Sequence, residues 1–225
     1  MITPEDYARW RATAVGRLTE RLEQDVVFGL SGDLRGRTVL DVACGDGAYS
    51  ISACKQGARV FGVDISKEML EAARQRAADC KQDITWCVAS AEDLPFESER
   101  FNVVIAVTAL CFVKDPQRTI QEAARVLRPG GSLIVGELGR CSLWALSRKV
   151  RGWLGSSTWS GVHFWTFQNL RRLIEQAGLR FHSRRTSVYF PPVGRVAQLL
   201  GPYNNAFSPL GQFAAAFLTF RADKV

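Results

Sequence analysis

Two glycines and a carboxylate in the first third of the chain have the types and spacing of a nucleotide-binding loop. Gly45 and Gly47 follow an apolar stretch, and helix-compatible residues begin at Ala48. Because glycine adopts backbone conformations that other residues avoid, such a loop brings its backbone close to a ligand. Asp64 ends the next apolar run, where a carboxylate can accept hydrogen bonds from ribose hydroxyls. The pattern predicts a βαβ unit that holds a nucleotide.

The residues around the loop favour one kind of nucleotide. Dinucleotide-binding loops carry a third glycine, and here that position is Ser50. Asp41 lies four residues before Gly45, where its charge would repel a phosphate and attract a cation. S-adenosylmethionine has no phosphate and carries an ammonium and a sulfonium group. The acidic loop therefore favours S-adenosylmethionine over NAD.

The cysteines do not indicate a metal site or a disulfide framework. There are six, without a Cys-x-x-Cys pair and without a histidine at metal-ligand spacing. We expect reduced thiols and no bound metal.

Length and composition predict one domain. The chain has 225 residues, of which 47% are hydrophobic, enough to fill one large core. No apolar run approaches the roughly 18 residues that a membrane span needs, and the N-terminus lacks the features of a signal peptide. A cytoplasmic location is the expectation.

Charge divides the chain into two unlike parts. Residues 1–138 carry 17 Lys/Arg and 20 Asp/Glu, a balance of −3, whereas residues 139–225 carry 12 and 2, a balance of +10. The basic part suggests an anionic partner such as an acidic substrate, a membrane surface or a nucleic acid. A solvated arginine-rich face is the alternative.

Alternating strand and helix patterns surround the loop and predict a doubly wound α/β sheet. The expected strands span residues 38–42, 59–63, 84–89, 101–107, 132–137, 179–190 and 212–221. The expected helices span residues 7–30, 48–56, 67–81, 115–127, 142–154 and 166–178. The helix at 142–154 is basic and amphipathic, so it is read either as a lid that packs on its own domain or as a membrane-surface helix. Residues 191–211 are expected to form a loop.

Four motifs, in register, resemble those of the class I S-adenosylmethionine-dependent methyltransferases. The resemblance is to the small-molecule group (methyltransferase type 11) that includes the quinone-biosynthesis C-methyltransferases. The motifs are Val39-Leu-Asp-Val-Ala-Cys-Gly-Asp-Gly, Val60-Phe-Gly-Val-Asp-Ile-Ser-Lys-Glu-Met-Leu, Ala91-Glu-Asp-Leu-Pro-Phe and Arg125-Val-Leu-Arg-Pro-Gly-Gly. The resemblance covers about residues 38–138 and implies a seven-stranded Rossmann-like sheet whose last two strands form an antiparallel edge hairpin.

The resemblance also implies how a single domain, residues 1–225, is divided. The parts are an N-terminal cap helix (1–30), a cofactor-binding core (38–138), a lid insert (139–165) and a C-terminal helix with the β-hairpin (166–225). The substrate pocket would be built by the cap helix, the insert and the 191–211 loop.

The family's cofactor contacts carry over to ten positions. They are Asp41, Ala43, Gly45, Gly47, Asp64, Ile65, Ser90, Ala91, Glu92 and Val107. The resemblance implies that Asp64 accepts both ribose hydroxyls, that Ile65 packs on the adenine ring and that Ala91 offers its backbone amide to that ring. Ser90 stands where an aspartate often bonds the adenine amino group. Cys111 and Phe112 replace a frequent His-His pair, so no catalytic role is inherited there.

On the substrate side, Tyr7, Trp10, Cys111 and Trp165 are the candidates for contact with the acceptor. Methyl transfer needs an oriented and desolvated nucleophile, and it needs a base only if the acceptor must lose a proton. His163, in the insert, is the candidate base or polar anchor, whereas His182 lies in a predicted strand and is expected to be structural. Further candidates for an aromatic cover are Trp144, Trp153, Trp159 and Tyr203.

The sequence therefore predicts a methyltransferase that uses S-adenosylmethionine and acts on a small organic acceptor, amphiphilic or anionic. A nucleic-acid methyltransferase is one alternative, disfavoured because the chain lacks the Asn/Asp-Pro-Pro-Tyr/Phe type of motif used on base amino groups. A non-catalytic S-adenosylmethionine-binding partner protein is another. Peripheral contact with a membrane is compatible with the basic insert.

Overall fold

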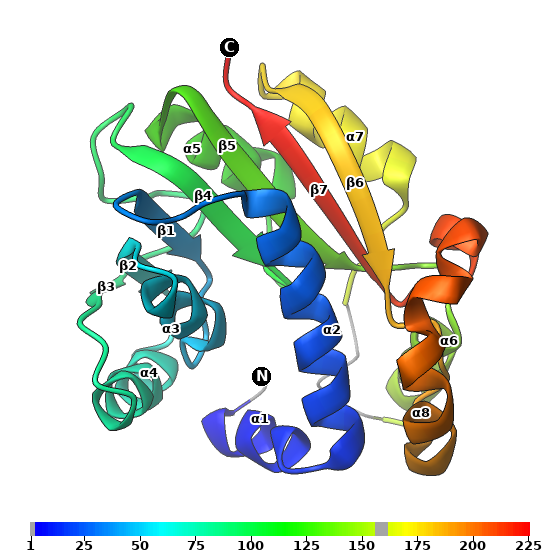
Figure 1. Cartoon of the computed structure of the whole chain (residues 1–225). Helices are drawn as coiled ribbons and strands as arrows, with labels where there is room; N and C mark the ends of the chain where they lie inside the picture. Colours follow the sequence, from blue (N-terminus) through cyan, green and yellow to red (C-terminus); the bar gives the residue numbers. More distant parts are fainter. Residues whose placement is uncertain (1–2, 156–161) are drawn as a thin grey trace.

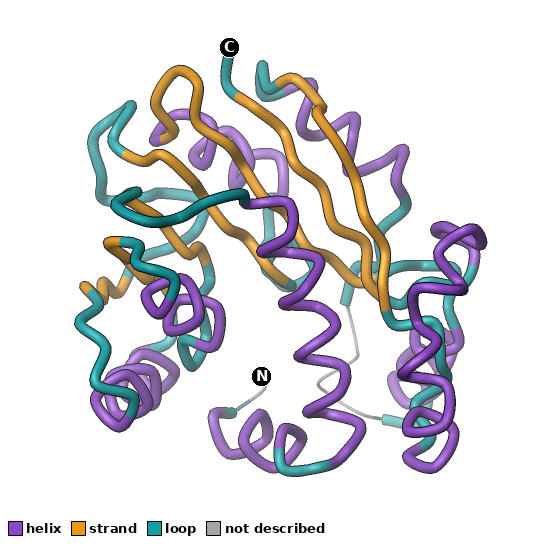
Figure 2. Tube along the Cα trace, in the orientation of Figure 1, coloured by secondary structure: helices purple, strands orange, loops and turns teal. Residues whose placement is uncertain are grey.

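A computed structural model of the chain describes residues 3–155 and 162–225. Its described part forms one seven-stranded sheet in the order β3-β2-β1-β4-β5-β7-β6 (Figures 1 and 2). The strands are β1 Thr38–Val42, β2 Arg59–Asp64, β3 Thr85–Val88, β4 Phe101–Val107, β5 Leu127–Leu138, β6 Arg180–Ser187 and β7 Phe217–Asp223. Strands β1 to β5 are parallel, and β7 pairs antiparallel with both β5 and β6. The predicted α/β sheet with an antiparallel edge hairpin is confirmed.

The central strand shows why the sheet forms in this order. Six of the seven residues of β4 are buried, as its unbroken apolar sequence predicts for a parallel strand covered on both faces. It pairs with β1 on one side and β5 on the other, so the chain reverses its winding direction between β1 and β4. In open α/β sheets, ligands bind at such a switch point, outside the carboxyl ends of the strands.

Helices cover both faces of the sheet. They are α1 Pro4–Arg11, α2 Ala14–Ser31, α3 Ala48–Lys55, α4 Lys67–Asp79, α5 Pro116–Val126, α6 Leu143–Trp153, α7 Phe167–Gln176 and α8 Gly194–Leu200, followed by the 3-10 segment η1 Gly201–Phe213. Residues of α5 and α7 share one apolar core with the sheet, and residues of α2, α3 and α8 share the core on the other face. Helix α2 packs against β5, β6 and β7 on the face of the sheet that is turned to the viewer in Figure 1.

Side-chain caps begin the helices where the sequence indicates. Thr3, Ser66, Asp115 and Thr166 each accept a hydrogen bond from a backbone N–H in the first turn of the following helix. These bonds satisfy donors that have no partner inside the helix. The predicted starts of α4, α5 and α7 are therefore confirmed.

The prediction of one helix over residues 7–30 was wrong, because α1 and α2 meet at a sharp corner. Thr13 caps α2 by accepting a hydrogen bond from Gly16 N (2.9 Å), and its hydroxyl donates to the carbonyl of Trp10 (2.7 Å). A Cβ at Gly16 would lie only 2.0 Å from that carbonyl oxygen, so the corner requires glycine. The helical spacing of apolar residues continues through the corner, so the sequence pattern gives no sign of the break between α1 and α2.

The prediction of a loop over residues 191–211 was also wrong. Most of this segment is helical, as α8 and η1, and β7 begins only at Phe217. The side-chain oxygen of Asn204 accepts hydrogen bonds from the backbone N–H groups of Val188 and Tyr189 (3.0 and 3.3 Å). Asn204 thus supplies partners for the backbone just beyond the end of β6, so the predicted strand to residue 190 ends earlier, at Ser187.

The insert after β5 forms the predicted helix, α6, and then returns to the sheet. Trp165 N donates to Leu138 O (2.8 Å), and Arg140 N donates to Trp165 O (2.9 Å). Both ends of the insert are therefore fixed at the carboxyl end of β5. Trp159 lies outside the described residues.

Candidate functional site

The glycine loop between β1 and α3 has the left-handed backbone that its sequence predicts. Ala43, Gly45 and Gly47 have φ values of 55°, 54° and 77°. A Cβ on Gly47 would lie 2.7 Å from the ring of Trp86 and 3.1 Å from Ala73, so only glycine fits there. A Cβ on Gly45 would meet nothing within 4 Å. Space is therefore open beside the loop at Gly45.

Asp64, at the end of β2, is fastened to this loop. Gly45 N donates to one carboxylate oxygen (2.8 Å), and Ser66 N donates to the other (2.9 Å). Two backbone donors hold the carboxylate in one orientation. The next side chain, Ile65, is 68% exposed. An oriented acceptor and an uncovered aliphatic side chain thus lie side by side at the switch point.

Asp41 is buried, and its carboxylate accepts a hydrogen bond from the hydroxyl of Ser50 (2.6 Å). Burial raises its pKa to about 7, against the effect of that hydrogen bond, and the nearby charge of Asp64 raises it further. In the present arrangement the side chain is thus occupied by Ser50. Its contact with a ligand ammonium group stays a prediction.

The positions expected around an adenine ring have mixed surroundings. Ala91 is buried, and Ser90 accepts a hydrogen bond from Glu92 N (3.2 Å). The carboxylate of Glu92 accepts bonds from the backbone N–H groups of Lys114 and Asp115 (2.8 Å each). Glu92 therefore supports the start of α5, a role that the sequence did not indicate. Its place beside a cofactor stays a prediction.

Asp46, between the two glycines, links the loop to two helices. Its buried carboxylate lies 2.8 Å from a guanidinium nitrogen of Arg11 in α1 and 2.9 Å from one of Arg76 in α4. Arg11 also lies 3.5 Å from Glu20 in α2. These ion pairs fasten the N-terminal helices over the glycine loop. The sequence analysis missed Asp46, because its partners come from distant parts of the chain.

Tyr7 lies at the end of β4, where the loop and the N-terminal helices meet. Burial raises its pKa, as do Cys111 and Asp46 nearby, while the Thr108 side chain opposes the rise through a hydrogen bond. The guanidinium of Arg11 lies 5.9 Å from the Tyr7 ring. The predicted substrate residue Tyr7 is thus brought to the glycine loop and to Cys111.

Trp10 occupies the corner between α1 and α2. It is half-buried, and its carbonyl accepts the hydroxyl bond that shapes the corner. That backbone contact gives Trp10 a structural role, and a role of its ring in substrate contact stays a prediction.

The turn after β4 is held by a glutamate that the sequence analysis missed. Glu137, at the end of β5, is fully buried and accepts a hydrogen bond from Leu110 N (2.7 Å). Burial raises its pKa to about 8. Thr108, beside the buried Val107, has a left-handed backbone with φ of 49°, and its carbonyl lies 3.2 Å from the Cys111 sulfur. Glu137 therefore shapes the turn that presents Cys111.

His163 and Trp165 come from the far end of the insert. His163 N donates to the carbonyl of Cys111 (3.3 Å), and its exposed ring lies 4.3 Å from the ring of Trp165. Trp165 is 5% exposed and packs in the core between the sheet and α7. The insert thus brings His163 beside Cys111, one of the predicted substrate residues.

The other aromatic candidates do not gather over this site. The Trp144 ring is buried and donates to the carbonyl of Phe190 (2.7 Å). Trp153 and Tyr203 are 84% and 62% exposed on the outer surface. These surroundings do not support the predicted aromatic cover at the three positions.

One more acid faces the N-terminal side of the site. Burial raises the pKa of Glu23, in α2, to about 8, although the charge of Arg148 in α6 opposes the rise. Burial lowers the pKa of Arg148, whose guanidinium lies 5.0 Å from the Trp144 ring. The sequence analysis missed both residues as site candidates.

Within the described residues, no group of three or more His, Cys, Asp or Glu side chains could hold a metal ion. Nor is any described helix long and apolar enough to cross a membrane.

The sheet order, the left-handed glycine loop after β1 and the carboxylate at the end of β2 define the class I methyltransferase fold. Residues 40–135 match the family model described as a methyltransferase domain. The chain thus has the fold of the class I S-adenosylmethionine-dependent methyltransferases, and its residues 40–135 are similar to a methyltransferase domain.

Three similar proteins show how far the resemblance extends. A SAM-dependent methyltransferase from Thermotoga maritima superimposes with a TM-score of 0.75 and is 26% identical, over 98% of this chain and 95% of that chain. An uncharacterized protein of Mycobacterium bovis is 41% identical over 108 residues, which are 48% of this chain and 39% of that protein. A ubiquinone biosynthesis O-methyltransferase of Coxiella burnetii is 36% identical over 107 residues, 48% of this chain and 46% of that protein.

The matched stretch thus spans less than half the length of these curated relatives. What the whole relatives act on bears on this chain only by analogy.

Proposed function

We propose that the glycine loop and Asp64 hold S-adenosylmethionine and that the chain transfers its methyl group to a small organic acceptor. One observation carries the proposal: the Asp64 carboxylate, oriented by Gly45 N and Ser66 N, lies beside the exposed side chain of Ile65. A fixed carboxylate suits a pair of ribose hydroxyls. An uncovered aliphatic side chain next to it suits the face of an adenine ring.

The electrostatics of the site support a cationic ligand. Burial raises the pKa of Asp41 to about 7 and that of Glu23 to about 8, because their ionised forms lack water and have too little positive charge nearby. A ligand with an ammonium and a sulfonium group would stabilise these ionised forms. The phosphates of a dinucleotide would do the opposite.

When bound, S-adenosylmethionine supplies a methyl group whose bond to the positively charged sulfur breaks readily, because the sulfur leaves as a neutral thioether. The task of the chain is then to orient the acceptor and to exclude water. The N-terminal helices serve this task by covering the loop through the ion pairs of Arg11 and Arg76 with Asp46. His163, beside Cys111, is the group we propose as base or polar anchor.

The acceptor that we propose is anionic or amphiphilic. The +10 balance of residues 139–225 supports an anionic group. The name of the Coxiella burnetii relative, a ubiquinone biosynthesis O-methyltransferase, supports a ring with a long apolar substituent, although less than half of either chain is matched.

Calorimetric titration tests the cofactor, and a product assay tests the transfer. We expect S-adenosylmethionine and S-adenosylhomocysteine to bind and NAD not to bind. A panel of hydroxybenzoates and catechols, with and without prenyl chains, is then incubated with radiolabelled S-adenosylmethionine. Binding without transfer to any small acceptor would favour a non-catalytic partner protein, and transfer to RNA or DNA alone would favour a nucleic-acid enzyme.

His163→Ala tests the proposed catalytic role. We expect turnover of the best acceptor to fall by about a hundredfold or more if His163 is a base, and by about tenfold if it only anchors the acceptor, with cofactor affinity unchanged. His182→Ala is the matched control, because His182 lies in β6 and pairs with Asp223 (2.9 Å). Equal turnover by both variants would exclude His163 from the reaction.

A further inference from the structure

Two cavities meet at Phe213, away from the glycine loop. The first, of about 690 Å³, lies between β6 and η1, and the second, of about 450 Å³, lies between α6 and the end of η1. Leu210 and Phe213 line the first, whereas Leu143, Leu146 and Phe213 line the second. We call Leu143, Leu146, Leu210 and Phe213 the Phe213 groove.

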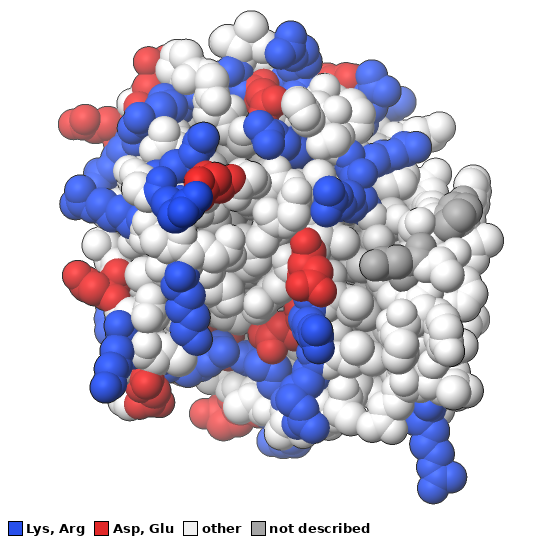
Figure 3. Space-filling view, in the orientation of Figure 1, with Lys and Arg blue, Asp and Glu red and all other residues white. Residues whose placement is uncertain are grey.

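The side chains of the groove are open to solvent. Leu143 and Leu146 are each 58% exposed, Leu210 is 51% exposed and Phe213 is 77% exposed. In Figure 3, the surface over α8 and η1 at the right is almost entirely uncharged. Other large apolar side chains lie exposed in the same elements, including Trp153 and Leu199. An exposed apolar surface of this extent on one chain indicates a binding surface.

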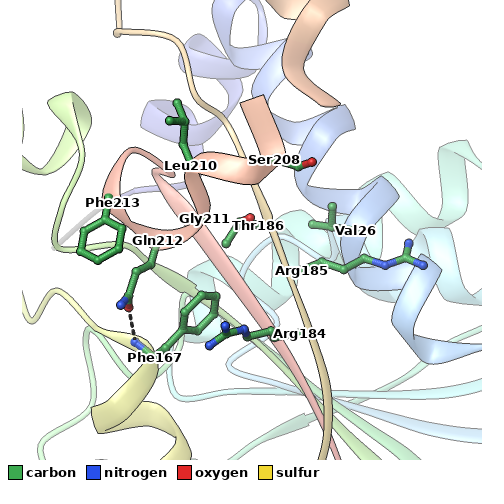
Figure 4. A pocket seen from close by; sticks show the side chains of 10 residues that line it. All are labelled: Val26, Phe167, Arg184, Arg185, Thr186, Ser208, Leu210, Gly211, Gln212 and Phe213. Carbon is green, nitrogen blue, oxygen red and sulfur yellow. Dashed lines mark hydrogen bonds between the residues drawn. The ribbon is translucent and has the colours of Figure 1, made fainter. Parts of the chain in front are cut away.

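Four cations line the same cavities. Arg184 and Arg185 line the first, and Arg140 and Lys149 line the second. Figure 4 shows Arg184 directed toward Phe167 and Arg185 directed the opposite way, toward α2, so Arg140 and Lys149 are the pair nearest to Leu143 and Leu146. No Asp or Glu lines either cavity, and the ion pairs between described residues include none of these four cations. The groove thus combines exposed apolar side chains with positive charge that no described carboxylate neutralises.

We propose that the Phe213 groove docks on the surface of a bilayer that contains anionic phospholipids. Cations near such a surface each contribute about 1 kcal/mol of attraction, and exposed apolar side chains gain by entering the boundary between head groups and acyl chains. Arg140 and Lys149 have aliphatic stems that can lie along this boundary while their charges reach the head groups. A bilayer supplies both partners that the groove lacks.

Other occupants match the groove less well. A second copy of the chain would place Arg140 and Lys149 against the same cations of its partner, because a twofold interface brings the same surface together. A nucleic acid would neutralise the cations and could stack a base on Phe213, but it would offer no aliphatic partner to Leu143 and Leu146. Of the three occupants, the bilayer satisfies both features.

Helix α6 connects this surface to the methyl-transfer site. Its inner residue Ala145 packs with Cys111 and Leu138, while Leu143 and Leu146 line the groove. A bilayer on the groove would therefore lie on the outer side of the helix whose inner side packs on Cys111. This arrangement goes beyond the proposed function and does not depend on it.

Vesicle sedimentation tests the proposal with the whole chain. The protein is mixed with vesicles of phosphatidylcholine alone or with about a third of phosphatidylglycerol, at low and high salt. We expect sedimentation with the anionic vesicles only, and release by salt. Phe213→Ser should lower the partition coefficient severalfold, and the double variant Arg140→Gln/Lys149→Gln should lower it by about fivefold for each cation.

Matched variants on other surfaces serve as controls. Lys55→Gln/Lys81→Gln removes two exposed cations from the ends of α3 and α4, and Val225→Ser removes an exposed apolar side chain. All variants are compared by thermal melting, so a loss of folding is recognised. The proposal is overturned if the groove variants sediment like these controls, if neutral vesicles bind equally well, or if no vesicle binds.

Light scattering and gel-shift assays identify the other occupants. Dimers that the groove variants dissociate would assign the surface to a second copy, and a salt-sensitive shift of RNA or DNA without vesicle binding would assign it to nucleic acid. Either result would overturn the bilayer proposal. Cofactor binding by the same variants is expected to equal that of the wild type.

Discussion

Arginines beside the glycine loop and arginines beside the Phe213 groove differ in whether they have a carboxylate partner. On the cofactor side, Arg11 and Arg76 both bind the buried carboxylate of Asp46, which lies within the glycine loop. On the C-terminal side, Arg140 and Arg184 line open cavities without a carboxylate partner among the described residues. The charges of Arg11 and Arg76 are neutralised inside the protein, whereas those of Arg140 and Arg184 face the cavities without a described carboxylate partner.

The difference indicates what each region is built to do. A loop that must hold one backbone shape gains from internal ion pairs that tie it to its surroundings. A surface that meets an outside anion keeps its cations unpaired, because internal pairing would compete with that partner. The predictions below test this contrast, from the largest expected effect to the smallest.

Asp64→Ala should have the largest effect, and it should be on cofactor binding. The change removes the proposed acceptor for two ribose hydroxyls, and hydrogen bonds to a charged group each contribute about 1.5–3 kcal/mol. We expect the dissociation constant for S-adenosylmethionine to rise at least about a hundredfold. Titration calorimetry measures it, with Asp33→Asn as the control, because Asp33 is exposed and pairs with Arg35 away from the glycine loop. An unchanged constant would remove Asp64 from the site.

Gly47→Ala should lower stability more than Gly130→Ala. Both glycines have left-handed φ, 77° and 74°, so both variants carry the backbone penalty of about 1 kcal/mol. Only at Gly47 would the new Cβ meet a side chain, 2.7 Å from Trp86, so we expect a total of about 3 kcal/mol there. Urea unfolding measures both. Equal losses would show that Trp86 does not restrict the loop.

Arg11→Gln and Arg140→Gln compare a paired arginine with an unpaired one. Removing Arg11 leaves the buried Asp46 with one cation fewer, so we expect a loss of about 1–3 kcal/mol. Arg140→Gln should change the free energy of unfolding by less than about 0.5 kcal/mol. A double-mutant cycle of Arg11 with Asp46 isolates their coupling. Similar losses for the two arginines would break the contrast between the regions.

The pH dependence of the free energy of unfolding should differ between the ligand-free and the ligand-bound protein. The pKa of Asp41 is raised to about 7 and those of Glu23 and Glu137 to about 8, so the folded chain holds these protons more tightly than the unfolded chain. Their contribution to stability is full below about pH 4 and is lost as the pH rises through the folded pKa values. A cationic ligand favours the ionised acids, so its stabilising effect should grow from about pH 6 to pH 8.

Thermal melting with and without S-adenosylmethionine at several pH values checks this dependence. Asp41→Asn should make the ligand's stabilising effect depend less on pH, since the amide keeps an acceptor for Ser50 and cannot ionise. A ligand shift that is constant with pH would contradict a role for these acids.

The sequence predicted the sheet and the glycine loop because both depend on local signals. Apolar runs mark the strands, and Gly45, Gly47 and Asp64 follow one another within a single βαβ unit. The corner at Thr13 was missed, since the apolar spacing of a helix continues through it. Glu137 and Asp46 were missed for a different reason: their partners are distant in sequence, and the residue types alone do not reveal the pairing.

The C-terminal third was predicted less well than the first half. Proline, glycine and asparagine in residues 191–211 indicated a loop, whereas tertiary contacts such as those of Asn204 stabilise helical turns there. The excess of basic residues was visible in the composition. The position of four of them around Phe213 depends on how α6, β6 and η1 meet.

A crystal structure with S-adenosylhomocysteine tests the division between the two regions most directly. The predicted result is a ligand whose ribose hydroxyls contact Asp64 and whose adenine ring covers Ile65, with the Phe213 groove left empty. A ligand bound in the Phe213 groove, or one that leaves Asp64 without a contact, would contradict it.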